Sequence, residues 1–200
     1  MNDWTGNSKS VYSTLGASSH SAKERESNDY YATDPYAIDV LINDGGANLA
    51  HNIWEVSCGE GHLSERLRAY GYNVKSTDLI DRGYGVGGID FLTCKEQFDG
   101  DILTNPPYKL AQEFVEHALE LIPDGRKVFM FLKLTFLEGK KRRKLFDTGC
   151  LKTLYVSTSR IPCAKNGDFE KSKKEGSAVA YGWYEFEKGY NGNPIIKWIN

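Results

Sequence analysis

Residues 52–71 read Asn-Ile-Trp-Glu-Val-Ser-Cys-Gly-Glu-Gly-His-Leu-Ser-Glu-Arg-Leu-Arg-Ala-Tyr-Gly. The short, mostly apolar run at 52–57 is typical of a buried strand, and it ends in two glycines, Gly59 and Gly61. Beyond them, Leu63, Leu67 and Tyr70 recur at helical spacing until a further glycine stops the helix. This stretch therefore predicts a strand, a glycine turn and a helix, in that order.

The same alternation continues on both sides of this stretch. Upstream, Asp34 and Pro35 are typical of the start of a helix. Downstream, we expect strands at 73–77, 101–104, 128–132, 153–157 and 177–186, and a short strand between the first two of these that ends at Asp90-Phe91. We also expect helices at 110–121 and 140–146. Strands that alternate with helices predict a doubly wound α/β domain, with a mostly parallel sheet whose ligand lies at the carboxyl ends of the strands.

Length and composition predict one domain. The chain has 200 residues and 40% hydrophobic content, enough for one sizeable core. Residues 1–28 are rich in Ser, Asn, Thr and Gly, so we expect a flexible tail there and a catalytic domain over 29–200.

No run is apolar enough to span a bilayer and the first residues do not resemble a signal peptide, so we expect a cytoplasmic protein, in the host-cell cytoplasm if a phage encodes it. The four scattered cysteines predict neither a disulfide framework nor a metal site.

The charge is unevenly distributed. The net charge is −2, but residues 131–176 hold twelve Lys and Arg against five Asp and Glu, a local charge of +7 that leaves −9 elsewhere. A basic region of this kind can face a phosphate backbone, and it can equally be a solvated helix and loop. Charge alone does not decide between these interpretations.

The most specific motif is Asn105-Pro106-Pro107-Tyr108, between a predicted strand and a predicted helix. Two prolines after a strand can simply end it. However, this tetrapeptide also suits the methylation of a planar amino group, whose lone pair is delocalised and poorly nucleophilic. The Asn105 side-chain oxygen and the Pro106 carbonyl can each accept one N–H bond and draw the nitrogen toward tetrahedral geometry. Tyr108 can stack on the ring that carries the amino group.

Two acidic residues follow other predicted strands. Asp78 comes seventeen residues after Gly61, where a carboxylate can accept both hydroxyl protons of a ribose or can cap a turn. Asp90 and Phe91 can offer a hydrogen bond and an apolar face to an adenine ring. A dinucleotide fingerprint requires a third glycine where Ser64 stands, which disfavours a nicotinamide enzyme.

Taken together, these motifs resemble a known family. Glu55, Gly59-x-Gly61, Asp78, Asp90-Phe91 and Asn105-Pro106-Pro107-Tyr108 occur in the order found in S-adenosylmethionine-dependent amino methyltransferases, and the chain most closely resembles the small phage-type DNA adenine-N6 methyltransferases. The resemblance covers about residues 29–200, and 176–198 resembles the final strand pair of such proteins. It implies a Rossmann-like sheet of seven strands with an antiparallel C-terminal strand. Cys58 and Glu60 depart from the residues common in the glycine turn.

The resemblance also implies a cofactor, S-adenosylmethionine, and its site. The segment before Pro35 would close over the methionine end, the glycine turn would underlie it, Asp78 would bind the ribose, and Asp90 with Phe91 would hold the adenine. The implied cofactor-binding residues are Tyr31, Thr33, Glu55, Ser57, Cys58, Gly59, Gly61, Asp78, Leu79, Asp90, Phe91 and Asn105.

The motifs identify the molecule that accepts the methyl group less directly. Amino groups of RNA bases and glutamine amides of proteins pose the same chemical problem, and a silent nucleic-acid-binding protein could retain the same pocket. The basic region favours double-stranded DNA with an extruded adenine, because phosphate contacts can offset the cost of base flipping. The expected DNA-binding residues are Lys140, Lys141, Arg142, Arg143, Lys165, Lys171, Lys173 and Lys174. A monomer and a homodimer both remain open.

Overall fold

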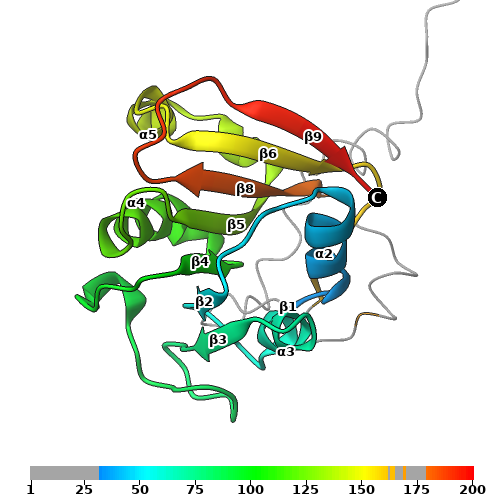
Figure 1. The fold of residues 1–200 in the computed structure, drawn as a ribbon, viewed down its shortest axis with the longest axis vertical. Coiled ribbons are helices and arrows are strands. Elements are labelled where there is room, and N and C mark those ends of the chain that lie inside the picture. Colours follow the sequence, from blue (N-terminus) through cyan, green and yellow to red (C-terminus); the bar gives the residue numbers. More distant parts are fainter. Residues whose placement is uncertain (1–31, 162, 165–168, 170–178) are drawn as a thin grey trace, which may run out of the picture.

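A seven-stranded sheet forms the centre of the protein, seen in a computed structural model that describes residues 32–161, 163, 164, 169 and 179–200 (Figure 1). The predicted tail at 1–28 lies outside these residues. The strand order is β3-β2-β4-β5-β8-β6-β9. The strands are β2 (Asn52–Glu55), β3 (Asn73–Ser76), β4 (Asp101–Thr104), β5 (Lys127–Lys133), β6 (Leu151–Ser157), β8 (Tyr181–Glu187) and β9 (Ile195–Ile199).

Most of the sheet is parallel, as the sequence predicts. Strands β3, β2, β4 and β5 pair in parallel, and β8 runs antiparallel to both of its neighbours, β5 and β6. The last strand, β9, pairs in parallel with β6 and forms one edge. The antiparallel strand of the C-terminal region is therefore β8, inserted between two strands of the opposite direction.

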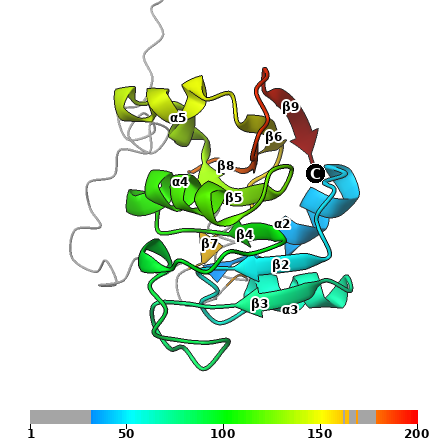
Figure 2. The ribbon, with the colours of Figure 1, turned by 60° about the vertical axis from the view of Figure 1, so that its left-hand side comes forward.

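Helices cover both faces of this sheet, so the domain is doubly wound. Figure 2 shows α4 and α2 on opposite sides of the strands. The helices are α2 (Tyr36–Asp39), the π-helical η2 (Val40–Asp44), α3 (His62–Ala69), α4 (Ala111–Leu121) and α5 (Arg143–Asp147), with 3-10 turns η3 (Phe91–Thr93), η4 (Tyr108–Leu110), η5 (Leu134–Leu137) and η6 (Lys140–Arg142).

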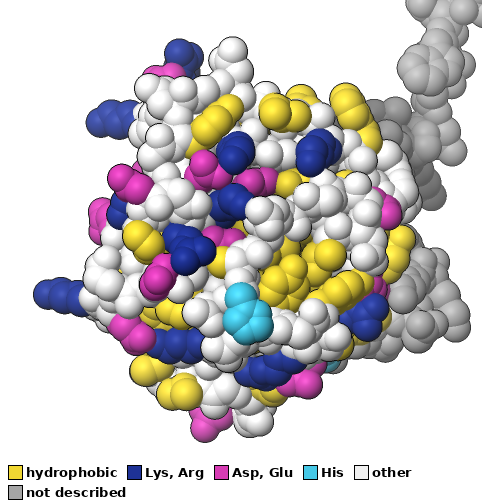
Figure 3. All heavy atoms as spheres, viewed as in Figure 1, with side chains coloured by type: hydrophobic (Ala, Val, Ile, Leu, Met, Phe, Trp, Pro, Cys, Tyr) yellow, Lys and Arg dark blue, Asp and Glu magenta, His cyan; other side chains and the backbone are white. Residues whose placement is uncertain are grey.

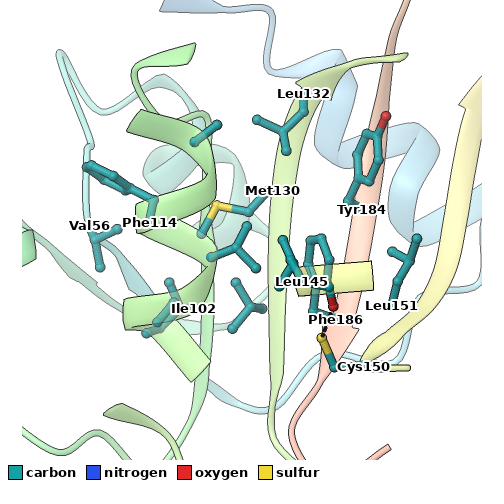
Figure 4. Packing of buried hydrophobic residues seen from close by; sticks show 14 of the residues in the cluster. Val56, Ile102, Phe114, Met130, Leu132, Leu145, Cys150, Leu151, Tyr184 and Phe186 are labelled. Carbon is teal, nitrogen blue, oxygen red and sulfur yellow. Dashed lines mark hydrogen bonds between the residues drawn. The ribbon is translucent and has the colours of Figure 1, made fainter. Parts of the chain in front are cut away.

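Alternate side chains of the central strand β5 fill two separate cores. Val128, Met130 and Leu132 belong to one core. Met130 packs there with Phe114 of α4 and Ile102 of β4 (Figure 4). Phe129 and Phe131, on either side of Met130 in sequence, pack in the core on the side of α2 and α3. The continuous apolar run of β5 thus reflects burial on both faces, which is typical of a parallel strand covered by helices.

The prediction of a strand that ends at Asp90-Phe91 is wrong. The described residues between β3 and η3 form only one isolated bridge, Thr77 to Val86, which lies outside the strands of the sheet, and Phe91 begins a 3-10 turn. Gly83 and Gly88 have positive φ angles in this segment, a conformation that bends a chain away from a strand. The loop instead folds back against the end of β3.

A small second sheet joins distant parts of the chain. Strand β1 (Ala32–Thr33) pairs antiparallel with β7 (Cys163–Ala164), with Thr33 opposite Cys163. Among the described residues, no helix combines the length and apolar character that a bilayer span requires.

Candidate functional site

A cavity of about 400 Å³ lies where the carboxyl ends of β2, β3 and β4 meet. Both its position and its size are typical of ligand sites in open α/β sheets. Of the predicted cofactor-binding residues, those whose side chains or backbone line the cavity are Thr33, Glu55, Ser57, Cys58, Asp78, Leu79, Asp90, Phe91 and Asn105. The segments that the sequence predicts to be functional thus converge on one cavity, although they are far apart in the chain.

The glycine turn after β2 lies next to the cavity, although the predicted cofactor-binding residues Gly59 and Gly61 are not among the residues that line it. Gly59 and Gly61 have φ angles of 56° and 84°, a conformation that favours glycine. A side chain at Gly61 would also collide with the ring of Tyr84, so the 79–90 loop packs directly on the turn. Gly61 is then the N-cap residue of α3, which begins at His62.

Asp78 holds the same turn from the end of β3. Its Oδ2 accepts a hydrogen bond from the Gly59 N–H at 2.7 Å, and its Oδ1 accepts one from the Ile80 N–H at 2.9 Å. A carboxylate can accept about four hydrogen bonds, so this buried side chain keeps acceptor capacity toward the cavity. The turn-capping and ligand-binding interpretations of Asp78 are therefore compatible with each other.

Glu55, the last residue of β2, is a buried acid. The Ser64 hydroxyl donates a hydrogen bond to its Oε2, and Ser64 is in turn 2.6 Å from the Ser76 hydroxyl. Burial raises the pKa of Glu55 from 4.5 to about 8, against the lowering effect of the Ser64 hydrogen bond. The side chain is therefore mostly protonated at neutral pH.

Cys58 lies beside it and is not an activated nucleophile. Burial, reinforced by the charges of Glu55 and Asp78, raises the pKa of the Cys58 thiol to about 12. A nucleophilic cysteine needs a lowered pKa, so this thiol stays neutral.

Phe91 and Asp90 meet the cavity at η3. Phe91 is only 2% exposed and packs edge to face on Trp54, with ring centroids 5.8 Å apart. Asp90 is exposed, and its Oδ1 accepts the Leu92 N–H at 3.1 Å. Phe91 is thus mainly a core residue that also contributes an apolar wall to the cavity.

Asn105 follows β4 and is one of the residues that line the cavity. Its Nδ2 donates a hydrogen bond to the Thr33 hydroxyl at 2.8 Å. Its Oδ1 is buried and has no hydrogen-bond partner among the described residues. Buried polar atoms are nearly always paired, so a buried amide oxygen without a partner beside a cavity indicates an acceptor reserved for a ligand.

Tyr108 begins the 3-10 turn that leads into α4. Its hydroxyl is 3.5 Å from Cys163 Sγ, its ring lies 5.8 Å from that of Tyr181, and Lys133 Nζ is 4.7 Å from its ring centre. Burial raises the pKa of Tyr108 well above 10, so the phenol stays protonated.

The predicted DNA-binding residues that the structure describes do not line this cavity. Lys140 and Lys141 are exposed, whereas Arg142 donates to the Phe136 carbonyl at 3.1 Å and Arg143 pairs with Asp147 at 2.5 Å. On the face seen in Figure 3, basic side chains are interspersed with acidic ones. Predicted residues outside the described part of the chain are Tyr31, Lys165, Lys171, Lys173 and Lys174.

Other basic residues lie at the site and were not predicted. Arg82 and Lys109 line the cavity, and Lys133 contacts the Tyr108 ring. Lys109 directly follows the Asn-Pro-Pro-Tyr motif and Lys133 ends β5, so both positions were open to prediction from strand ends. Within the described ranges, no three His, Cys, Asp or Glu side chains form a group that could hold a metal ion.

Comparison with known proteins identifies the fold. No protein-family model and no curated protein matches the sequence. Among solved structures, a protein assigned as a class I S-adenosylmethionine-dependent methyltransferase from Listeria monocytogenes matches with a TM-score of 0.54 and 10% identity, over 82% of this chain and 62% of that one. The fold is that of the class I methyltransferases.

Two further matches have the same fold. A modification subunit assigned to a type I restriction enzyme of Vibrio vulnificus matches with a TM-score of 0.56 and 11% identity, over 95% of this chain and 50% of that one. TrmN from Thermus thermophilus matches with a TM-score of 0.53 and 17% identity, over 77% and 48%. The aligned region thus spans about half to three fifths of these three proteins.

Proposed function

We propose that this protein is an S-adenosylmethionine-dependent methyltransferase that methylates the N6 amino group of adenine in DNA. The observation that carries the proposal is the buried Asn105 Oδ1, which has no partner among the described residues and belongs to a residue that lines the cavity. An amide oxygen in this position suits one N–H bond of an amino group.

Pro106 supplies the second acceptor. Its carbonyl accepts none of the backbone hydrogen bonds found between the described residues, and the two prolines restrict the backbone on which it sits. Two acceptors on one nitrogen favour the tetrahedral geometry that frees its lone pair. These contacts strengthen as the nitrogen changes geometry, so they stabilise the transition state more than the bound substrate.

The cavity residues suit S-adenosylmethionine. Asp78 keeps acceptors for the two ribose hydroxyls, Phe91 offers an apolar wall and Asp90 an exposed acceptor for the adenine, and the glycine turn lets the backbone approach the methionine end. When bound, this cofactor supplies an electrophilic methyl group. The neighbouring Cys58 thiol is neutral, which agrees with direct transfer without a covalent enzyme intermediate.

DNA as the acceptor is supported by charge near the site. Lys109 lies in the cavity wall and Lys133 lies over the Tyr108 ring. Lys140 and Lys141 do not line the cavity, but they are exposed and follow β5 in the chain. Cations around a pocket can hold phosphates while a base is extruded, and Tyr108 can stack on that base. A restriction-modification subunit with the same fold adds support by analogy.

The test compares acceptors directly. Purified protein is incubated with tritiated S-adenosylmethionine and duplex DNA, RNA or protein, and transfer is counted for each. We expect label in DNA that contains adenine and none in DNA in which adenine is replaced by purine, which lacks the amino group. Preferred transfer to RNA or to protein glutamine would reassign the acceptor. Cofactor binding without transfer to any of them would indicate a silent binding protein.

A further inference from the structure

The small sheet formed by β1 and β7 holds two side chains against the Asn105 amide. Thr33 Oγ1 accepts the Asn105 Nδ2 hydrogen bond at 2.8 Å, and Cys163 Sγ lies 3.9 Å from the same nitrogen. Thr33 is only 4% exposed, so water has little access to replace this contact. Thr33 precedes Asn105 by more than seventy residues and Cys163 follows it by more than fifty, yet both lie at its amide.

The orientation of an asparagine amide is decided by its hydrogen bonds. A half-turn of the side-chain amide exchanges the oxygen and the nitrogen with almost no change of shape. With the nitrogen toward the cavity, the amide would offer donors where a substrate amino group also offers donors. Only the orientation in which Oδ1 faces the cavity can accept a substrate N–H.

Thr33 supports that orientation because its hydroxyl is available as an acceptor. The Thr33 side chain also hydrogen-bonds with Cys163, whose sulfur can accept the hydrogen bond that the Thr33 hydroxyl donates and so leave the Thr33 lone pairs for Asn105 Nδ2. The two contacts therefore form a short chain from Asn105 through Thr33 to Cys163.

We propose that Thr33 is a positioning residue that fixes the Asn105 amide with Oδ1 toward the cavity. This inference rests on the proposed function and deepens it. It differs from the role that family resemblance implies for Thr33, which is to close over the cofactor. A positioning role affects the transfer step, whereas a cofactor-closing role affects cofactor affinity.

Two substitutions at this position separate the roles. Thr33→Val keeps the shape and removes the hydrogen-bond acceptor, so the rate of methyl transfer at saturating DNA and cofactor should fall about tenfold, the size expected for one hydrogen bond. Cofactor affinity and the KM for DNA should stay within about twofold. Thr33→Ser keeps the hydroxyl and should recover most of the rate.

Thr104→Val is the matched control. Thr104 is a fully buried threonine on β4, next to Asn105, and its hydroxyl makes one long contact of 3.5 Å to the Ser57 carbonyl. Removing this hydroxyl should leave the transfer rate near that of the wild type.

Single-turnover transfer and calorimetric cofactor binding are measured for all four proteins. An unchanged rate in Thr33→Val, a defect that Thr33→Ser does not recover, or a defect explained by weaker cofactor binding would each overturn the inference while leaving the proposed function in place. A folded wild type that binds cofactor and methylates no acceptor would instead overturn the proposed function, and this role of Thr33 with it.

Discussion

Replacing Glu55 by Gln should raise the stability of the protein most at alkaline pH and least at acid pH. Glu55 is 2% exposed and its pKa is raised from 4.5 to about 8 by burial. Between these two pH values the unfolded chain loses the Glu55 proton while the folded chain keeps it. The unfolded state then binds fewer protons, so the free energy of unfolding falls as pH rises.

The size of the effect follows from the two pKa values. Each pH unit between 4.5 and about 8 lowers the free energy of unfolding by up to about 1.4 kcal/mol. The decrease reaches about 3 kcal/mol at pH 7 and about 5 kcal/mol above pH 8. Glutamine resembles the protonated acid in shape and can still accept the Ser64 hydrogen bond, so Glu55→Gln avoids this decrease.

Urea unfolding at pH 5, 6, 7 and 8 measures the difference between Glu55→Gln and wild type. Taking the difference removes the contribution of other groups, including Asp101, whose pKa burial also raises. Glu65→Gln is the control, because Glu65 is exposed on α3 and its pKa is lowered by hydrogen bonds to Tyr84 and Arg68. A difference between Glu55→Gln and wild type that stays constant from pH 5 to pH 8 would mean that the folded protein does not hold Glu55 protonated.

Three further changes probe the proposed contacts with the cofactor and with DNA. Asp78→Asn should weaken cofactor binding at least about tenfold in calorimetry and also lower the unfolding midpoint, because the Gly59 and Ile80 N–H groups then share one oxygen. Unaltered cofactor affinity would exclude a ribose contact. Tyr108→Ala should lose about 1–3 kcal/mol of base stacking and raise the KM for DNA, whereas Tyr108→Phe should behave nearly as wild type in the same kinetics; equal defects would contradict stacking. Joint replacement of Lys140 and Lys141 by Gln should lower the slope of log affinity against log salt by about 0.9 for each phosphate that the two lysines neutralise, with Lys75→Gln, which removes a lysine paired with Glu96, as control.

Local patterns predicted the elements that position the site. The change from a strand to a helical period around Gly59 and Gly61 predicted β2, the turn and α3, and the apolar run of β5 predicted a strand buried on both faces. The position of Asn105 after β4 followed from the same alternation. These features depend on neighbours in sequence, which is why the sequence alone predicted them.

Features that depend on distant contacts were missed. The pairing of Thr33 with Cys163 joins segments 130 residues apart, and two-residue strands leave no periodic pattern. The extended segment before Asp90 lacked a partner strand because its glycines bend the chain. Arg142 was expected to grip phosphate, but its guanidinium instead binds carbonyl groups of the preceding turn, a contact that charge counting cannot reveal.

The identity of the methylated atom tests the proposed function most sharply. Duplex DNA is incubated with the protein and isotopically labelled S-adenosylmethionine, digested to nucleosides and analysed by mass spectrometry, for wild type and for Asn105→Ala at equal cofactor occupancy. We expect labelled N6-methyl-2′-deoxyadenosine from the wild type and its near absence from Asn105→Ala, because that variant lacks the buried acceptor in the cavity wall. Label on another base, or equal labelling by the two proteins, would contradict adenine N6 methylation through Asn105.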